Sequence, residues 1–466
     1  MAEEPVGPSA AEIARAVSAG ELSAVEAVEA CLRRVDRLNE TLNAIVTLNP
    51  SVIDEAREQD DRIANGETLP LAGVSVGIKD VTPVAGLRTT YGSPVYTQHV
   101  PFEDALVVQR LRAAGALILG KTNTPEFAAG GNTWNDVFGR TRNPWDPTKS
   151  AGGSTGGGAV GLATGMIALA EGTDLGGSLR IPASFCGVLG LRPSPGLVPT
   201  HPSDWVWDTL QVTGPMGRTA EDVALMLQVV AGPSPFSPLR QPTAGRDFVQ
   251  ATRRGPQPKL RLAYCPDIAG IGVDPEVERV CRNAADALAN LGHHVEEVTL
   301  DFAKARDAFL SLRGYWFVSH MYERLGHIEE FGVNVKNNTQ AGLSGSALDL
   351  GRAERVRSEM WHTFRVFFET FDHLLTPTMC VSPFPVEENY PETVAGRKMR
   401  TYVDWLAPTF LLSLTGLPIG SVPCGLDAEG MPVGLQVVGR PAGEEAVLAL
   451  MAAVQAAHPM TIPQEW

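Results

Sequence analysis

Two segments of the sequence show a helical pattern that is followed by a glycine and then by a short apolar run. Residues 103–114 carry apolar side chains at helical spacing, Gly115 closes the predicted helix, and residues 116–119 are typical of a buried strand. The same order returns in residues 277–300, around Gly292. Helices that alternate with buried strands favour an α/β fold, in which helices cover a largely parallel sheet.

A further buried strand is predicted at residues 71–78, and it ends abruptly at the polar pair Lys79 and Asp80. Polar side chains at the ends of buried strands often carry the chemistry of α/β proteins. Before this strand, residues 11–64 show apolar side chains at helical spacing among many charges, which predicts a helical outer layer.

The middle of the chain changes in composition twice. Six prolines between residues 231 and 258 indicate either a domain boundary or a long surface loop. Residues 304–400 are richer in aromatic and charged side chains, which suits either a lid over a site or the core of packed helices. Helically spaced aromatics favour the second interpretation.

Charge and cysteine usage exclude several classes of protein. The formal net charge of −15 opposes binding to nucleic acid, which requires a basic face. The six cysteines form no CxxC pair, so neither a zinc knuckle nor a disulfide framework is predicted. The N-terminus lacks the pattern of a secretory signal, and prolines and glycines interrupt the apolar residues 405–426. We therefore expect a cytoplasmic protein without a membrane or nucleic-acid partner.

Residues 151–190 combine many glycines with serines, threonines and a single aspartate. Glycine serves where the backbone approaches a ligand closely, so the segment predicts either a phosphate-binding loop or an acyl-transfer site. Residues 152–158 (GGSTGGG) lack the lysine and the context that a phosphate loop requires. In the second interpretation, Leu175, Gly176 and Gly177 present N–H groups beside the Ser178 hydroxyl, as an oxyanion hole requires.

A serine nucleophile needs a base, and no histidine lies between His99 and His201. Lys79 at the strand end is the simplest alternative to a histidine base. An exposed lysine, with a pKa of about 10.4, is charged near neutrality, so Lys79 must be buried to act as a base. A purely structural interpretation stays open from these residues alone, with Lys79 capping a strand and the serine in a turn.

Seven segments resemble, in order and across nearly the whole chain, the amidase signature enzymes. They are residues 77–80 (GIKD), 120–123 (GKTN), 152–157 (GGSTGG), 174–182 (DLGGSLRIP), 185–187 (FCG), 214–216 (GPM) and 430–436 (GMPVGLQ). The resemblance favours the catalytic interpretation over the structural one.

The resemblance implies a single large α/β/α domain over residues 1–466, with a mixed central sheet of about ten or eleven strands covered by helices. Within it we expect a helical outer layer in residues 1–64 and a catalytic core in residues 65–235. These are followed by a variable helical or lid region in residues 236–404. The C-terminal part of the core is expected in residues 405–466. The proline-rich segment then becomes a loop.

The resemblance also implies the roles of three residues. Ser178 is the nucleophile, Lys79 is the base, and Ser154, with a cis peptide before it, bridges the two. Ser154 accepts the proton of Ser178 and passes its own to Lys79, and the reverse relay protonates the leaving amine. Thr155 and Gly158 replace serines that the family commonly has, but neither belongs to the triad.

Residues around the nucleophile receive supporting roles. We expect Asp174 and Arg180 to anchor the glycine loop by charged hydrogen bonds, with binding of a substrate carboxylate as the alternative. Thr173 is expected beside them. Gly130 and Gly131 are expected to offer backbone contacts to the substrate, as the corresponding segment does in relatives.

The predicted function is hydrolysis of a small carboxylic amide through an acyl-enzyme, with no metal or organic cofactor. Esters, anilides, hydrazides and carbamates are further candidate substrates. The main alternative is the glutaminase subunit of a tRNA-dependent amidotransferase, and a silent binding module is disfavoured by the intact triad. A homo-oligomer is left open. Three tryptophans either line a substrate pocket or serve packing: Trp205, Trp207 and Trp316.

Overall fold

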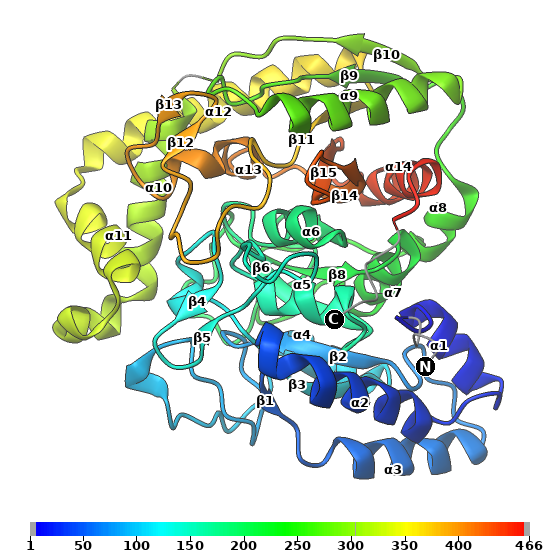
Figure 1. Cartoon of the computed structure of the whole chain (residues 1–466). Coiled ribbons are helices and arrows are strands. Elements are labelled where there is room, and N and C mark those ends of the chain that lie inside the picture. The colour runs from blue at the N-terminus through cyan, green and yellow to red at the C-terminus, as the bar shows by residue number, and fades with distance from the viewer. Residues whose placement is uncertain (1–5, 303, 461–466) are drawn as a thin grey trace.

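The computed structural model describes residues 6–302 and 304–460 of the chain, and these form one sheet of 11 strands flanked by helices (Figure 1). The predicted α/β fold with a mixed sheet is thus confirmed. The strand order is β1 (Ile45–Leu48), β3 (Leu117–Thr122), β2 (Ser75–Lys79), β6 (Leu169–Asp174), β8 (Val212–Gly217), β7 (Leu189–Arg192), β14 (Ile419–Leu426), β15 (Pro432–Val438), β11 (His373–Pro377), β9 (Arg261–Tyr264) and β10 (His294–Glu297).

The sheet is parallel only toward its two ends. Strand β2 pairs in parallel with β3 and β6, and β9 pairs in parallel with β10 and β11. The central strands from β6 through β8, β7, β14 and β15 to β11 are all antiparallel neighbours. The expectation of a largely parallel sheet was therefore wrong for the centre, because helix–glycine–strand units identify only the parallel parts.

The N-terminal segment forms α1 (Ala10–Ser18), α2 (Ala24–Leu42) and α3 (Val52–Ala64). Capping boxes start the first two helices, where Ser9 pairs with Glu12 and Ser23 with Glu26. The predicted helical layer is correct for these helices, but it missed β1, which lies between α2 and α3 and pairs antiparallel with β3. A strand of four residues is too short to interrupt a helical pattern visibly.

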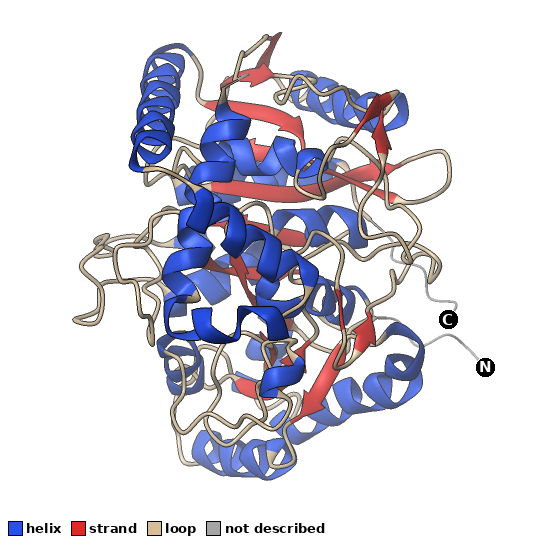
Figure 2. Ribbon diagram, turned by 90° about the vertical axis from the view of Figure 1, so that its left-hand side faces the viewer, coloured by secondary structure: helices blue, strands red, loops and turns tan. Residues whose placement is uncertain are grey.

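Helices lie on both sides of the strands (Figure 2). One apolar core joins the N-terminal helices to the sheet and to several helices of the second half of the chain. Its further helices are α4 (Leu106–Ala113), α5 (Gly156–Ala163), α6 (Arg180–Cys186), α7 (Ala220–Val230), α8 (Phe248–Arg254), α9 (Pro275–Asn290) and α14 (Glu444–Ala457). A second core gathers around α10 (Ala305–His320), α11 (Val333–Ser344), α12 (Ala347–Thr370) and α13 (Ala407–Ser413).

Short elements complete the described chain. Two small hairpins pair β4 (Trp134–Asn135) with β5 (Gly139–Arg140) and β12 (Thr393–Val394) with β13 (Arg397–Lys398). The 3₁₀ turns are η1 (Pro94–Tyr96), η2 (Glu126–Ala128), η3 (Tyr322–Glu330) and η4 (Asp404–Leu406). The apolar residues 405–426 divide among η4, α13 and β14, and none of the helices described is long and apolar enough to cross a membrane.

The segment of residues 236–404 is more than a helical region, since it gives β9, β10 and β11 to the sheet. Its aromatics divide between interior and surface. Trp316, Phe317 and Phe364 are buried, which agrees with the helix-core interpretation, while Tyr322 is 68% exposed. The finer division of the domain stays a prediction.

Candidate active site

Lys79 is the last residue of β2, and its side chain is completely buried. Its Nζ lies 2.7 Å from Ser154 Oγ and 3.0 Å from Thr173 Oγ1. The apolar strand that precedes Lys79 thus carries the amino group into the interior, where two hydroxyls are its hydrogen-bond partners.

Burial changes the acid–base chemistry of this lysine. Removal from water lowers the pKa of Lys79 to about 7, although the charges of Glu171 and Asp174 act in the opposite direction. A substantial fraction of the amino group is therefore neutral near pH 7 and able to accept a proton. This is the property that a lysine base requires.

Ser154 lies just before α5, after a cis peptide bond between Gly153 and Ser154. The backbone of residues 130 and 131 packs directly against this bond, since a Cβ added to Gly153 would lie 3.0 Å from Gly130 O. Gly131 in turn faces Trp405, whose ring would be 2.6 Å from a Cβ on that glycine. Gly130 and Gly131 are thus brought to the serine loop.

Ser178 lies between β6 and α6 and is partly exposed. The N–H of Thr155 donates to Ser178 O over 3.2 Å, which joins the loops of the two serines side by side. Among the described residues, the Ser178 hydroxyl makes no hydrogen bond to another group. It therefore remains available to a substrate and to Ser154.

The glycine loop before Ser178 leaves several N–H groups without an acceptor. Within the described chain, the N–H groups of Leu175, Gly176 and Ser178 donate to no other residue. The N–H of Gly177 differs, because it donates to Asp174 Oδ1 over 2.9 Å. Two of the three predicted donors thus remain without an acceptor, as does the N–H of Ser178 itself, which sequence reasoning missed.

Arg180 anchors this loop through a saturated set of hydrogen bonds. Its Nε and Nη2 each lie 3.0 Å from a carboxylate oxygen of Asp174. Its other donors reach Thr409 O, Gln436 Oε1 and Ser413 Oγ at 2.7–3.0 Å. All five N–H groups of a guanidinium are then occupied, so Arg180 has none left for a substrate carboxylate.

Arg192 at the end of β7 is a second cation on Asp174 that the sequence did not reveal. Its Nη1 donates to Asp174 O and lies 3.3 Å from Oδ1, and both side chains are fully buried. Burial alone would raise the pKa of Asp174, but Arg180 and Arg192 outweigh it and lower the pKa to about 2. Asp174 therefore stays ionised and holds the loop throughout the working pH range.

A second buried lysine lies on β3, the strand next to that of Lys79. Lys121, in the GKTN segment on β3, donates to Thr82 O and to Thr89 Oγ1, the latter over 3.1 Å. Glu171 on β6 accepts the backbone N–H of Lys79 at 3.2 Å and the Thr82 hydroxyl at 3.0 Å. Burial lowers the pKa of Lys121 to about 8. The motif indicated Lys121, but no sequence pattern indicated Glu171.

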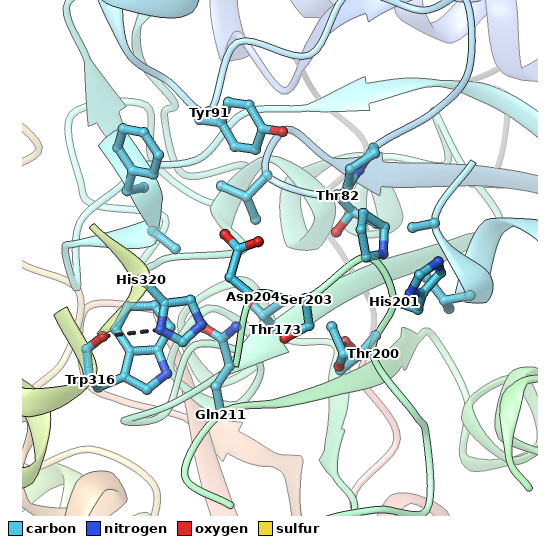
Figure 3. A pocket seen from close by; sticks show the side chains of 18 of the residues that line it. Thr82, Tyr91, Thr173, Thr200, His201, Ser203, Asp204, Gln211, Trp316 and His320 are labelled. Atoms are coloured by element: carbon cyan, nitrogen blue, oxygen red, sulfur yellow. Dashed lines mark hydrogen bonds between the residues drawn. The ribbon is translucent and has the colours of Figure 1, made fainter. Parts of the chain in front are cut away.

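A cavity of about 340 Å³ adjoins this site (Figure 3). Thr173, which contacts Lys79, forms part of its wall, and Tyr91, Phe127 and Trp316 give it an aromatic lining. Of the three tryptophans considered from the sequence, Trp316 lines this cavity. Trp205 borders a smaller neighbouring hollow of about 40 Å³, and Trp207 is 64% exposed.

Comparison with known proteins shows the family of the chain. The family model described as Amidase matches residues 26–448. The chain therefore belongs to the amidase signature family, and the family and enzyme class predicted from the sequence are confirmed.

The chain is similar to several named proteins. The chain is 38% identical to an acylamidase of Rhodococcus erythropolis, covering 97% of this chain and 95% of that one. It is 36% identical to a glutamyl-tRNA(Gln) amidotransferase subunit of Symbiobacterium thermophilum, with 90% of each chain covered. Its fold matches the crystal structure of a bacterial aryl acylamidase with a TM-score of 0.90 and 28% identity, over 97% and 96% of the two chains.

Proposed function

We propose that this chain hydrolyses a carboxylic amide through an acyl-enzyme on Ser178, with Lys79 and Ser154 as the proton relay. The observation that carries the proposal is the 2.7 Å contact between Lys79 Nζ and Ser154 Oγ, made by a buried lysine with a pKa of about 7. A neutral amine bonded to a hydroxyl can withdraw its proton, as a general base requires.

The reaction follows from this geometry. Ser178 Oγ attacks the substrate carbonyl carbon and passes its proton to Ser154, whose own proton moves to Lys79. The oxyanion that forms is stabilised by the unpaired N–H groups of Leu175 and Gly176. The relay then runs in reverse to protonate the leaving amine, and the C–N bond breaks. Water cleaves the acyl-enzyme by the same relay, which restores free Ser178.

The relatives support a simple acylated amine as the substrate. One is named an acylamidase and another an aryl acylamidase. Anilides of small carboxylic acids are therefore the first substrates to test, followed by esters, hydrazides and carbamates. The net charge of −15 and six free, buried cysteines support action in the cytoplasm on a small molecule rather than on nucleic acid.

The glutaminase component of a tRNA-dependent amidotransferase is the second candidate function. The 36% identity to one chain of such an enzyme, over 90% of the sequence, favours it. The purified chain distinguishes the two functions. An acylamidase cleaves an anilide alone, whereas a glutaminase component releases ammonia from glutamine only in the presence of its partner chains.

Replacing Ser154 with alanine tests the relay. We expect Ser154→Ala to lower kcat/KM for an anilide by about 10²–10³-fold, because Lys79 loses the hydroxyl that connects it to Ser178. Thr155→Val is the matched control, since it removes the neighbouring hydroxyl, which is buried and has no hydrogen-bond partner among the described residues. Similar activity in Ser154→Ala and in the control, with both variants folded, would contradict the relay.

A further inference from the structure

The cavity reaches the site next to Lys79. Thr173 connects the two, because its Oγ1 is 3.0 Å from Lys79 Nζ and its side chain also lines the cavity. The amine that departs must lie within reach of Ser154, which Lys79 supplies with the proton. A leaving amine that extends into this cavity stays close to the relay.

Asp204 is the only carboxylate that lines the cavity in the described chain. It is exposed and makes no hydrogen bond or ion pair with any described residue. Figure 3 shows its carboxylate directed into the space between Tyr91 and His320. The nearby Asp208 is different, because its oxygens accept from Trp316 Nε1, from the N–H of Leu210 and from that of Gln211 at 2.7–3.1 Å. Asp204 thus has its full acceptor capacity available.

His320 adds a second acceptor to the cavity wall. Its Nδ1 lies 3.0 Å from Trp316 O, and since a carbonyl can only accept, Nδ1 carries the hydrogen. Nε2 of the neutral ring then holds a lone pair. Burial lowers the pKa of His320, against the charges of Asp208 and Asp204, and this favours the neutral ring. Stacking on Trp316, with ring centroids 3.7 Å apart, fixes its plane.

Arg324 is the one cation that lines the cavity in the described chain, and two of its five N–H groups are held by other residues. Arg324 donates from Nε to the Tyr96 hydroxyl at 2.7 Å and from Nη1 to His320 O at 3.1 Å. Its guanidinium also lies against the ring of Phe127, 6.0 Å from the centroid. Asp204 is therefore the charged group of the lining that has no described partner, while the hydroxyls and the Gln211 amide of the lining serve as donor or acceptor equally.

We propose that this cavity binds a leaving amine that carries a second, protonated amino group, and that Asp204 is the residue that selects for it. The aromatic walls of Tyr91, Phe127 and Trp316 suit a flat or aliphatic spacer between the two nitrogens. The inference rests on the proposed amide hydrolysis and names the substrate class of the same site.

The test compares two anilides that share one acyl group. One leaving amine is 4-(aminomethyl)aniline, and the other is 4-ethylaniline, in which a methyl group replaces the ammonium. The measured quantity is the kcat/KM for the charged anilide divided by that for the neutral anilide. Comparing this ratio between variants cancels the different intrinsic reactivities of the two anilides. We expect Asp204→Asn to lower the ratio by about fivefold, as the loss of a solvent-accessible ion pair implies.

Asp286→Asn is the matched control, because it removes one exposed carboxylate from α9, outside the cavity lining, and changes the net charge equally. Its ratio should equal that of the wild type, and salt should reduce the wild-type ratio toward that of Asp204→Asn. An unchanged ratio in Asp204→Asn would overturn the selection by Asp204 and leave the amidase function intact. Failure of the wild type to cleave either anilide would contradict both proposals.

Discussion

Ser178→Ala is expected to lower kcat/KM for an anilide by about 10⁴-fold or more, because removal of a serine nucleophile eliminates the covalent route altogether. The variant should fold normally, since the Ser178 hydroxyl bonds no other described group. Parallel measurement of kcat/KM and of the thermal midpoint tests both statements. Activity within tenfold of the wild type in a folded variant would exclude Ser178 as the nucleophile.

The second large effect concerns Lys79 and pH. If neutral Lys79 is the base, kcat/KM falls as pH decreases through the lysine pKa, because protonation removes the acceptor, and it levels off above that pKa. Burial lowers this pKa to about 7, so the rise should be centred near pH 7 rather than above pH 10. Lys79→Met should lose about 10⁴-fold in kcat/KM and should lose this ionisation as well.

Lys121→Met is the matched control for that experiment. It also removes a buried lysine with a lowered pKa, but one that bonds Thr82 and Thr89 instead of Ser154. It is expected to lose stability and to keep the rise near pH 7. A rise that persists in Lys79→Met, or disappears in Lys121→Met, would assign the ionisation to another group.

The proposed catalytic residues could be located in the sequence because each stands in a local pattern. Lys79 ends an apolar strand, and Ser154 and Ser178 lie in glycine-rich turns, so neighbouring residues alone restrict their surroundings. Arg192 and Glu171 were not predictable. Their roles arise when β7 and β6 meet residues distant in sequence, and a single arginine or glutamate in a strand carries no sign of such contacts.

In the glycine loop, the sequence pattern identified the candidate N–H donors but not which of them stay without an acceptor. Successive N–H groups at Leu175, Gly176 and Gly177 looked equivalent in the sequence. In the structure Asp174 accepts the N–H of Gly177, which has a φ of +123°, and a Cβ there would lie 2.3 Å from Thr409 Oγ1. The side chain that decides which N–H remains free comes from outside the glycine pair.

The fold, like the site, was predictable in part. The helix–glycine–strand units correctly gave β3 and β10, each with the helix before it. The antiparallel centre of the sheet could not be predicted from the residue pattern, because strand direction depends on how the connections cross the sheet. Hydrophobic periodicity does not report these connections. The edge strand β1 escaped it because four residues between two amphipathic helices leave the helical spacing almost undisturbed.

The most direct test of the proposed mechanism is to map the covalent intermediate. The purified chain is treated with a slow anilide or with a serine-directed phosphonate, and its intact mass and peptides are measured, with Ser178→Ala as the control. We expect one adduct per chain, located on Ser178 and missing from the variant. An adduct on Ser154, or an adduct that persists in Ser178→Ala, would contradict the proposed mechanism.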